Sequence, residues 1–556
     1  MCKGSFPAKG YERKGPGGEW RCCESVAFAL QMIIARNILR WLATEGFCWS
    51  VLVPEDTVRL TAGRVPGAVS ELLPGRLGFA LAVASLCLWA GAATAAPPPI
   101  SIPVDTESFE TNPAGRGPFA FLYTLERSNY LLGDMWGLRT LLSQYGMSLG
   151  VLETSEILGN ATGGSRTGAE YDGLTQMVLQ LDTNRTFGLY GGLFNVSALD
   201  IHGRNLSADN LLTLQTASGI EGDRSLRLWE LWYQQKFLEE DRLDVKIGQQ
   251  SLDQEFMVSQ NALLFVNTMF GWPMLPSADL PGGGPAYPLS ALGVRLRARP
   301  INAVTILAGV FNGSPVAVNE GDPQQQNPSG ISFPLNGGEL ALLELQYAYP
   351  ALGNVVYPGE AEALARTYRI GVWYDTEDFA DQRFDTAGLS LANPASSGNP
   401  RLHRGDYAVY AVADQMVWVW DKDTNRNLDV FGRVMGTPLA DRNLIDFSAN
   451  AGFVLHQPLP YRNDDSFGIG IGYAHVSGQA AALDRDTVAF TGSFTPVRSG
   501  ETYLEATYQY QATPWWQLQP DIQYVFNPGA GIANPNAPAR RVGDELVLGL
   551  RTNILF

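Results

Sequence analysis

The last twelve residues of the chain, 545–556, read ELVLGLRTNILF and alternate between two kinds of side chain. Every second position is apolar or a threonine, and the series ends on an aromatic residue: Leu546, Leu548, Leu550, Thr552, Ile554 and Phe556. The other face carries Glu545, Gly549, Arg551 and Asn553. A repeat of two residues is typical of a β-strand whose faces meet different surroundings. The end of the chain therefore predicts a two-faced strand.

The same alternation recurs upstream in residues 504–511, 517–526, 445–453 and 292–299. In the third of these stretches the predicted apolar face holds Ile445, Phe447, Ala449, Ala451 and Phe453. In the last, it holds Val294, Leu296 and Ala298, opposite Arg295, Arg297 and Arg299. Stretches of about nine to eleven residues are long enough for a tilted strand to cross a bilayer.

Alternation alone also fits a secreted soluble β-protein, in which the apolar face meets a second sheet. Three further features favour a membrane barrel. After residue 96 there is no apolar run of helical length, so the backbone could cross a membrane only in a closed barrel. The terminal Phe556 resembles the end signal of bacterial outer-membrane barrels. Aromatic residues gather where strands are predicted to end: Trp418 and Trp420, Trp515 and Trp516, and Trp229, Trp232 and Tyr233.

Composition excludes several other classes of protein. Hydrophobic residues make up 45% of the 556 residues, charged residues only 17%, and there are 59 glycines, which argues against a coiled coil, a helical bundle or a disordered chain. All five cysteines precede residue 96, so the rest of the chain forms no disulfide or thiolate metal site. That part carries 29 basic and 49 acidic residues, a net charge of −20, which disfavours nucleic acid as a partner.

The first 95 residues predict a leader. Residues 70–95 contain Arg76, an apolar run and then Ala93-Thr94-Ala95, as in a secretory signal peptide cleaved after Ala95. A transmembrane anchor is the alternative, but the run is short for one and no basic residues follow it. Because a signal peptide is expected at the start of a chain, residues 1–69 are interpreted as an over-extended gene start, with translation beginning near Val69.

The exported part is expected to divide into an N-terminal segment, 96–145, and a barrel, 146–556. After Asp134, leucines and a methionine at helical spacing predict one short helix before the first strand: Met135, Leu138, Leu141 and Leu142. The 411 barrel residues suit sixteen strands, although eighteen would fit nearly as well. The fold class is thus an all-β, antiparallel transmembrane barrel.

Predicted connections are of two lengths, as on the two rims of a bacterial barrel. Short turns are expected at Asn184-Arg185 and Asn302-Ala303. Long, Gly-, Pro- and Asn-rich loops are expected at 273–289, 312–337, 375–403 and 527–540.

Several motifs across nearly the whole exported part resemble the carbohydrate-selective outer-membrane porins of the OprB type. They include residues 134–140 (DMWGLRT), 228–232 (LWELW), 267–273 (NTMFGWP), 280–289 (LPGGGPAYPL) and 519–524 (QPDIQY). The resemblance implies a sixteen-stranded barrel in the bacterial outer membrane, narrowed by inward-folded loops, through which glucose and related sugars diffuse passively. Outer-membrane lipid and, as one possibility, a homotrimer of barrels are the partners that go with this interpretation.

A sugar offers hydroxyl groups at its edge and weakly apolar faces, so a selective lumen needs fixed donors, acceptors and aromatic walls. Arginine suits this task because its planar fork holds several donors rigidly. The candidate pore-lining residues are Arg227, Glu230, Trp232, Lys246, Glu255, Arg295, Arg297, Arg299 and Arg369. Each could instead be an ordinary solvated residue of a polar lumen; Glu230 and Trp232 gain weight because they lie in a family motif. Removing Arg295 and Arg297 is expected to weaken sugar block without unfolding the barrel.

No enzymatic signature appears. The four histidines are far apart in sequence and form no zinc-protease motif, and there is no nucleophile elbow. The alternating oxygens of residues 421–429 lack the glycine and glutamate of a calcium loop, so a solvated turn is expected and no metal or cofactor is assigned. Two rival functions stay open: a general diffusion porin with a weak anion bias, and an outer-membrane hydrolase using His403 or His475.

Overall fold

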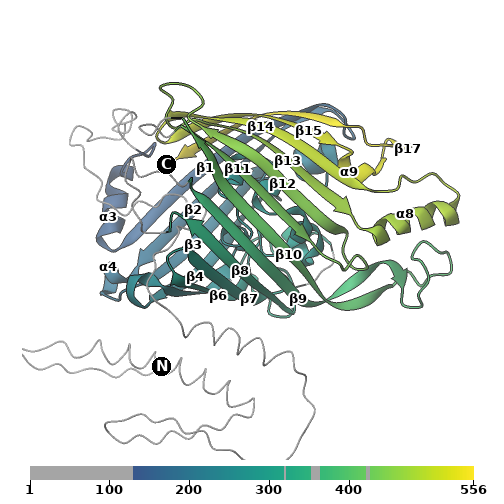
Figure 1. Ribbon diagram of the computed structural model, residues 1–556, viewed down its shortest axis with the longest axis horizontal. Helices are drawn as coiled ribbons and strands as arrows, with labels where there is room; N and C mark the ends of the chain where they lie inside the picture. Colours follow the sequence, from purple (N-terminus) through teal and green to yellow (C-terminus); the bar gives the residue numbers. More distant parts are fainter. Residues whose placement is uncertain (1–128, 318–320, 352–363, 421–425) are drawn as a thin grey trace, which may run out of the picture. The chain divides into compact units, whose positions relative to one another are not determined.

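The computed structural model describes residues 129–317, 321–351, 364–420 and 426–556 (Figure 1). The predicted leader and most of the predicted 421–429 turn lie outside these ranges. Sixteen strands close into one antiparallel barrel, in which β1 pairs with both β2 and β18. This confirms the predicted fold.

The barrel strands are β1 (Met147–Thr162), β2 (Gly168–Asp182), β3 (Gly192–Gly203), β4 (Ser225–Phe237), β5 (Leu243–Gln250), β6 (Ala291–Ile301), β7 (Val304–Asn312), β8 (Glu339–Tyr349), β9 (Arg366–Asp385), β10 (Pro400–Val419), β11 (Asn427–Gly436), β12 (Ile445–His456), β13 (Ser466–Val476), β14 (Gly500–Thr513), β15 (Trp516–Phe526) and β18 (Glu545–Leu555).

The two rims of the barrel differ, as Figure 1 shows. One rim carries α3 (Leu138–Gln144), α4 (Thr183–Phe187) and the short 302–303 turn. The opposite rim carries longer loops, with α8 (Gly478–Thr491), α9 (Pro528–Gly531) and the small sheet of β16 (Ala533–Asn534) and β17 (Ala537–Arg541). Within the described ranges, no helix is long and apolar enough to cross a bilayer.

The loop predicted at 375–403 is wrong for most of its length. β9 continues to Asp385 and β10 begins at Pro400, so the connection covers only residues 386–399. Polar residues that suggested a loop lie instead in a hairpin that extends the barrel wall, where both faces of a strand can meet water.

The predicted short helix precedes the first strand, as η2 (Met135–Gly137) followed by α3. It lies at the seam where the barrel closes. Leu131 N donates to Leu555 O at 2.8 Å, and the buried Arg139 guanidinium donates to Leu149 O and Phe556 O. The segment before β1 thus holds the two ends of the barrel together.

The alternation of the last strand is confirmed: Leu548 and Leu550 are exposed on the outer face, whereas Glu545 is fully buried on the inner face. The prediction that Ile445 lies on the outer face is wrong, because its side chain is buried inside the barrel. The β12–β13 register shifts between Ile445 and Phe447, and such an irregularity moves the residues on one side of it to the other face.

Trp229 and Trp232, expected in an aromatic girdle, are also corrected: both are buried on the inner face. The β3–β4 register pairs Ser197 with Glu230 but Ala198 with Leu228, which leaves Trp229 as the extra residue of a bulge. The bulge turns the indoles of this motif into the lumen.

The apolar core lies within the lumen. The connection between β5 and β6, residues 251–290, supplies much of it and is called the inner loop below. It contains η5 (Leu252–Gln254), η6 (Asn261–Leu264), α5 (Thr268–Gly271), α6 (Met274–Asp279) and η7 (Pro281–Gly283). Its Phe265 and Phe270 stack with ring centroids 4.3 Å apart, and both contact Phe431 of β11. A long apolar segment between two strands can only bury itself by folding into the barrel.

The glycines of β13 make room for this loop. A Cβ on Gly470 would lie 2.4 Å from the Phe270 ring, and one on Gly468 would lie 2.8 Å from the Phe265 ring. These glycines are therefore small, lumen-facing residues of the strand.

Candidate functional site

The inner loop is fixed by carboxylates of the barrel wall that accept hydrogen bonds from its backbone. Glu344 Oε2 of β8 accepts from Met257 N at 2.8 Å, and Glu505 of β14 accepts from Val266 N at 2.6 Å and Asn267 N at 3.1 Å. Carboxylates that accept backbone N–H groups in a low-dielectric site form strong hydrogen bonds. The wall therefore determines the path of the loop through the lumen.

The β9–β10 wall adds a further attachment. Arg369, a predicted pore-lining residue, donates to Asp414 Oδ2 at 2.8 Å. Asp414 also accepts from Ser259 Oγ at 2.6 Å and from Asn261 N at 3.3 Å, both in the inner loop. Arg369 thus compensates the charge of a loop-binding carboxylate.

Arg433 of β11 also holds the inner loop, but as a donor to backbone carbonyl groups of the loop. Its buried guanidinium donates to Met257 O at 2.8 Å, Gly271 O at 2.8 Å and Phe270 O at 3.1 Å, and it also contacts Met269 O. One arginine therefore donates to four carbonyl groups of the inner loop. The sequence analysis did not select Arg433, because its position in a strand is like that of any polar lumen residue.

Lys246, Glu255, Arg295, Asp244 and Arg297 form one continuous ionic network, called the charged wall below. Four come from β5 and β6, and Glu255 comes from the inner loop. Glu255 pairs with Lys246 and with Arg295, the Arg295 Nε to Glu255 Oε2 distance being 2.5 Å. Asp244 pairs with Arg295 and accepts from Arg297 Nε at 2.6 Å. Asp244 was missing from the predicted set.

The charged wall holds three cations and two anions, and each carboxylate has two cationic partners. Burial acts to raise the pKa of the Glu255 carboxyl, but the neighbouring Arg295 and Lys246 outweigh it and hold that pKa well below its usual range. Glu255 is therefore ionised at any physiological pH, and it ties the inner loop to the wall.

The arginine ladder predicted to face water is mostly buried. Arg295 and Arg299 are each 2% exposed, and Arg299 donates to Asp241 O. Arg297 keeps a side chain that is 15% exposed. The arginines lie on the inner face of β6; Glu255 of the inner loop and Asp244 cover Arg295, whereas Arg299 contacts backbone carbonyls of the 238–242 turn.

The remaining predicted residues of β4 also lie inside the barrel. Lys246 Nζ sits over the Trp232 ring, 4.6 Å from its centroid, in a cation–π contact. Glu230 Oε1 accepts from Ser251 N, at the start of the inner loop, at 3.1 Å. Arg227 lies apart, and among the described residues only its Nε has a protein partner, Ser225 Oγ at 2.9 Å.

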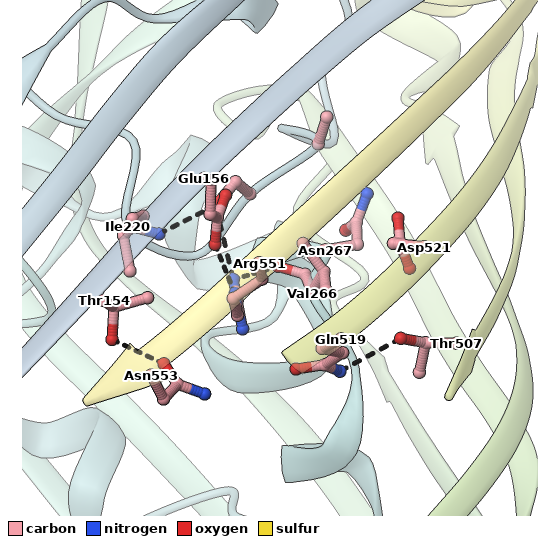
Figure 2. Close-up of polar contacts among 12 residues, drawn as sticks. Thr154, Glu156, Ile220, Val266, Asn267, Thr507, Gln519, Asp521, Arg551 and Asn553 are labelled. Carbon is pink, nitrogen blue, oxygen red and sulfur yellow. Dashed lines mark hydrogen bonds and ion pairs between the residues drawn. The ribbon is translucent and has the colours of Figure 1, made fainter. Parts of the chain in front are cut away.

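A second, mostly neutral surface lines the arc of β14, β15, β18 and β1. Its amides form a chain: Gln517 Nε2 donates to Gln511 Oε1 at 2.6 Å, and Asn553 Nδ2 donates to Gln517 Oε1 at 3.2 Å. Thr154 Oγ1 donates to Asn553 Oδ1 at 2.8 Å, a contact drawn in Figure 2. These residues and Gln509 are called the amide wall below. Its glutamines and Asn553 are only half-buried, so they remain accessible from the lumen.

Above the amide wall, the inner loop meets the same arc. Arg551 pairs with Glu156 and points toward Val266, and Gln519 donates to Thr507 Oγ1 at 3.0 Å (Figure 2). Gln519 also donates to Leu264 O at 2.6 Å. The loop therefore narrows the lumen beside a surface rich in donors and acceptors.

Glu221, in the 204–224 loop, gives a prediction for pH. Its carboxylate accepts from Ser207 N at 3.1 Å, and burial raises its pKa to about 7. Because an unfolded glutamate titrates near 4.3, the folded state is favoured while the group is protonated, and this contribution is lost as pH rises through about 7. Between pH 5 and pH 8, wild type is expected to lose on the order of 3 kcal/mol relative to Glu221→Gln in detergent unfolding.

The matched control is Glu239→Gln, which neutralises an exposed carboxyl on the 238–242 turn and should leave the wild-type pH dependence in place. Parallel pH curves for wild type and Glu221→Gln would contradict the prediction.

A closed barrel with an apolar outer belt, two unequal rims and a polar lumen narrowed by an attached loop defines an outer-membrane porin. A family model described as "Carbohydrate-selective porin, OprB family" matches residues 166–556. The chain belongs to this family, and it is a sugar-selective channel of the bacterial outer membrane.

Individual relatives are distant but span the same length. Porin B of Pseudomonas aeruginosa is 24% identical over 452 residues, covering 77% of this chain and 92% of the relative. The putative porin QuiX of Acinetobacter baylyi is 22% identical over 450 residues, covering 77% and 93%. The high-pH structure of OprB from Pseudomonas putida has the same fold, with a TM-score of 0.67, 23% identity, and coverage of 78% of this chain and 100% of that one.

Proposed function

We propose that the channel passes glucose and related neutral sugars by passive diffusion, with the amide wall and Arg297 as the groups that a sugar contacts. The observation that carries this is the difference in access between the two surfaces. The amides of Gln509, Gln511, Gln517 and Asn553 are half-buried, whereas most of the charged wall is covered. A neutral polyol exchanges hydrogen bonds with amides at little net cost, so it binds weakly and leaves quickly.

In this proposal the charged wall has a positioning role. It fixes the inner loop through Glu255 and so sets the width of the lumen beside the amides. The buried candidates Arg227, Arg295, Arg299 and Glu230 shape the channel instead of binding sugar.

Replacing Gln517 and Asn553 together by leucine is expected to weaken glucose block about tenfold, because two hydrogen bonds of about 0.5–1.5 kcal/mol each are lost. Single-channel recording with millimolar glucose measures the block. Gln176→Leu is the matched control, since it removes a half-buried, inward-facing amide of β2 outside the amide wall and should leave block within twofold. Wild-type current unaffected by glucose would favour a general diffusion porin instead, and unchanged block in the double variant would remove the amide wall from the proposal.

Family and fold are those of a channel rather than an enzyme. We infer further that no catalysis accompanies transport. The rival hydrolase needs an aspartate near His403 or His475, and both have one: His403 Nε2 lies 2.8 Å from Asp381 Oδ2, and His475 Nδ1 lies 2.6 Å from Asp446 Oδ1. Replacing both histidines tests the inference, because a loss of hydrolysis with unchanged sugar uptake would contradict it.

Export and assembly complete the proposal. The mature chain is expected to begin at Ala96, and N-terminal sequencing of protein from outer membranes checks this; recovery of Met1 would contradict it. We also propose that the barrel lies in outer-membrane lipid, where the alternatives of a single barrel and a homotrimer are told apart by native mass spectrometry.

A further inference from the structure

We propose that the channel also takes sugar acids, which are polyols that carry one carboxylate. In this inference the open edge of the Arg297 guanidinium binds the carboxylate, and the amide wall receives the hydroxyl groups. The inference rests on the proposed function, because it uses the same sugar-contacting groups and adds a substrate class to them. It differs from a weak anion bias of the whole lumen, since it requires one particular cation together with the amides.

The charged wall carries one positive charge in excess, and this charge meets the lumen at Arg297. The three cations of the wall, Lys246, Arg295 and Arg297, share the carboxylates of Glu255 and Asp244. The side chains of Lys246 and Arg295 are only 6% and 2% exposed, whereas that of Arg297 is 15% exposed. Asp244 is 1% exposed, so its negative charge is covered by its partners. A solute in the lumen therefore meets the excess charge at Arg297.

Only one edge of the Arg297 guanidinium is used by the protein. Its Nε donates to Asp244 Oδ2 at 2.6 Å, and within the described ranges its terminal nitrogens Nη1 and Nη2 form no hydrogen bond. Neither of these nitrogens is among the buried polar atoms without a partner, so both have access to the lumen. A guanidinium is a planar fork of donors that matches the two oxygens of a carboxylate. Arg297 thus keeps a pair of donors for such a group.

Arg297 and the amide wall lie in the same half of the lumen. On β6, Arg297 lies two residues nearer to the short 302–303 turn than Arg295, which holds the inner loop. On β18, Asn553 is likewise nearer to the short-turn rim than Arg551, and Figure 2 shows it further along the strand. Both surfaces therefore line the part of the lumen between the inner loop and the short-turn rim, called the short-turn half below.

The two surfaces belong to opposite arcs of the barrel. In the closed ring of sixteen strands, β14 lies eight strands from β6 in either direction, and β15 and β18 follow it. Gln509 and Gln511 are on β14, and Gln517 is on β15. A solute in the short-turn half thus passes between a cationic fork on one side and half-buried amides on the other. A sugar acid has its charge at one end and hydroxyl groups along the rest, so it is complementary to both surfaces.

The other charged side chains of the short-turn half offer a carboxylate less. Lys236 of β4 is 41% exposed, but its Nζ lies 2.9 Å from Asp241 Oδ2, which compensates its charge. Arg299 is 2% exposed. On the β11–β12 wall, Asp429 and His456 lie 3.8 Å apart, and the carboxylate of that pair repels an anion. Among the described residues, these contacts leave Arg297 as the best-placed partner for a carboxylate.

Single-channel block by D-gluconate and by D-glucose, measured at equal ionic strength on the full-length barrel, tests the inference. In wild type, gluconate is expected to block at about five- to tenfold lower concentration than glucose, the gain from one charge-assisted pair at a partly exposed site. Arg297→Gln keeps a donor but no charge and should bring this ratio to about one. Arg227→Gln is the matched control, because it removes a buried cation of β4 on the long-loop side of the inner loop and should keep the wild-type ratio. Acetate has a carboxylate but no hydroxyl groups and should block several-fold more weakly than gluconate.

Equal block by gluconate and glucose in wild type would overturn the inference, and so would a ratio that survives in Arg297→Gln. Acetate block as strong as gluconate block would also overturn it, since the amide wall would then take no part. In each of these cases, glucose block that persists in wild type leaves the proposed function intact. A wild-type current that glucose does not change would instead reject the proposed function itself.

Discussion

Replacing Arg433 by methionine is expected to release the inner loop, raise single-channel conductance several-fold and abolish glucose block. Methionine keeps an unbranched chain but removes every donor, so the carbonyls of Met257, Phe270 and Gly271 lose their Arg433 donor inside the barrel. Met269 O also loses Arg433 but keeps a donor, Asn450 Nδ2 at 2.7 Å. An unsatisfied buried acceptor costs about 1–3 kcal/mol, and several at once exceed what one loop can tolerate. The carbonyls would then reach water only if the loop leaves the wall.

Arg433→Lys is the control, because it keeps the charge and one donor group and should retain part of the block. Protease sensitivity of the inner loop, measured on the folded barrel, separates a released loop from a barrel that does not assemble. Wild-type conductance and wild-type protease resistance in Arg433→Met would contradict this account of the loop.

Replacing Arg295 by methionine is expected to destabilise the barrel by about 3 kcal/mol, because Asp244 and Glu255 each lose one of their two buried cationic partners. Arg295 pairs with Asp244 and with Glu255, and it is 2% exposed. Unfolding in detergent, followed by loss of the folded band on heating, measures the change. Open-channel selectivity should shift toward cations at the same time, since the lumen loses a positive charge.

The matched comparisons are internal to the network. Arg297→Met removes a partly exposed arginine that shares Asp244 and should cost clearly less. Adding Asp244→Asn and Glu255→Gln to Arg295→Met should deepen the loss, because Lys246 and Arg297 would then have no anionic partner in the network. Equal losses for Arg295→Met and the triple variant would show that packing, not charge, dominates. The expectation from sequence that both arginines could be removed without harm to the fold is thus replaced by one in which Arg297 alone is dispensable.

Patterns of period two predicted an antiparallel barrel, and helical spacing after Asp134 predicted the short helix before β1. The number of sixteen strands came from the chain length, which suited eighteen nearly as well, and from the family resemblance. The patterns failed where a strand is irregular. Bulges at Trp229 and at Ile445 move neighbouring side chains to the opposite face of the strand. In the sequence, the break in alternation that a bulge causes cannot be distinguished from an ordinary irregularity of the pattern. The 375–403 loop failed for a related reason, since strands that extend beyond the membrane are polar on both faces.

For the candidate site, sequence placed all nine selected residues on the barrel wall or in the loop beside it, but it could not give them roles. Arg297 and Arg295 are two residues apart in one strand, yet one meets the lumen and the other is covered by Glu255. Glutamine and asparagine residues of the amide wall carried no signal, because any polar residue suits a wet inner face.

The sequence by itself determined the class of this protein: alternating faces, an exported part without cysteines, and motifs of a sugar porin. Only the tertiary structure decided how the lumen is occupied. The path of the inner loop is determined by contacts such as the hydrogen bond from Val266 N to Glu505, two residues that are 239 positions apart in the sequence. It is also determined by glycines such as Gly470, which leave space for the aromatic rings of the loop. Such contacts depend on barrel closure, which places strands that are distant in sequence around one lumen. The local order of side chains therefore does not predict which of these residues will be in contact.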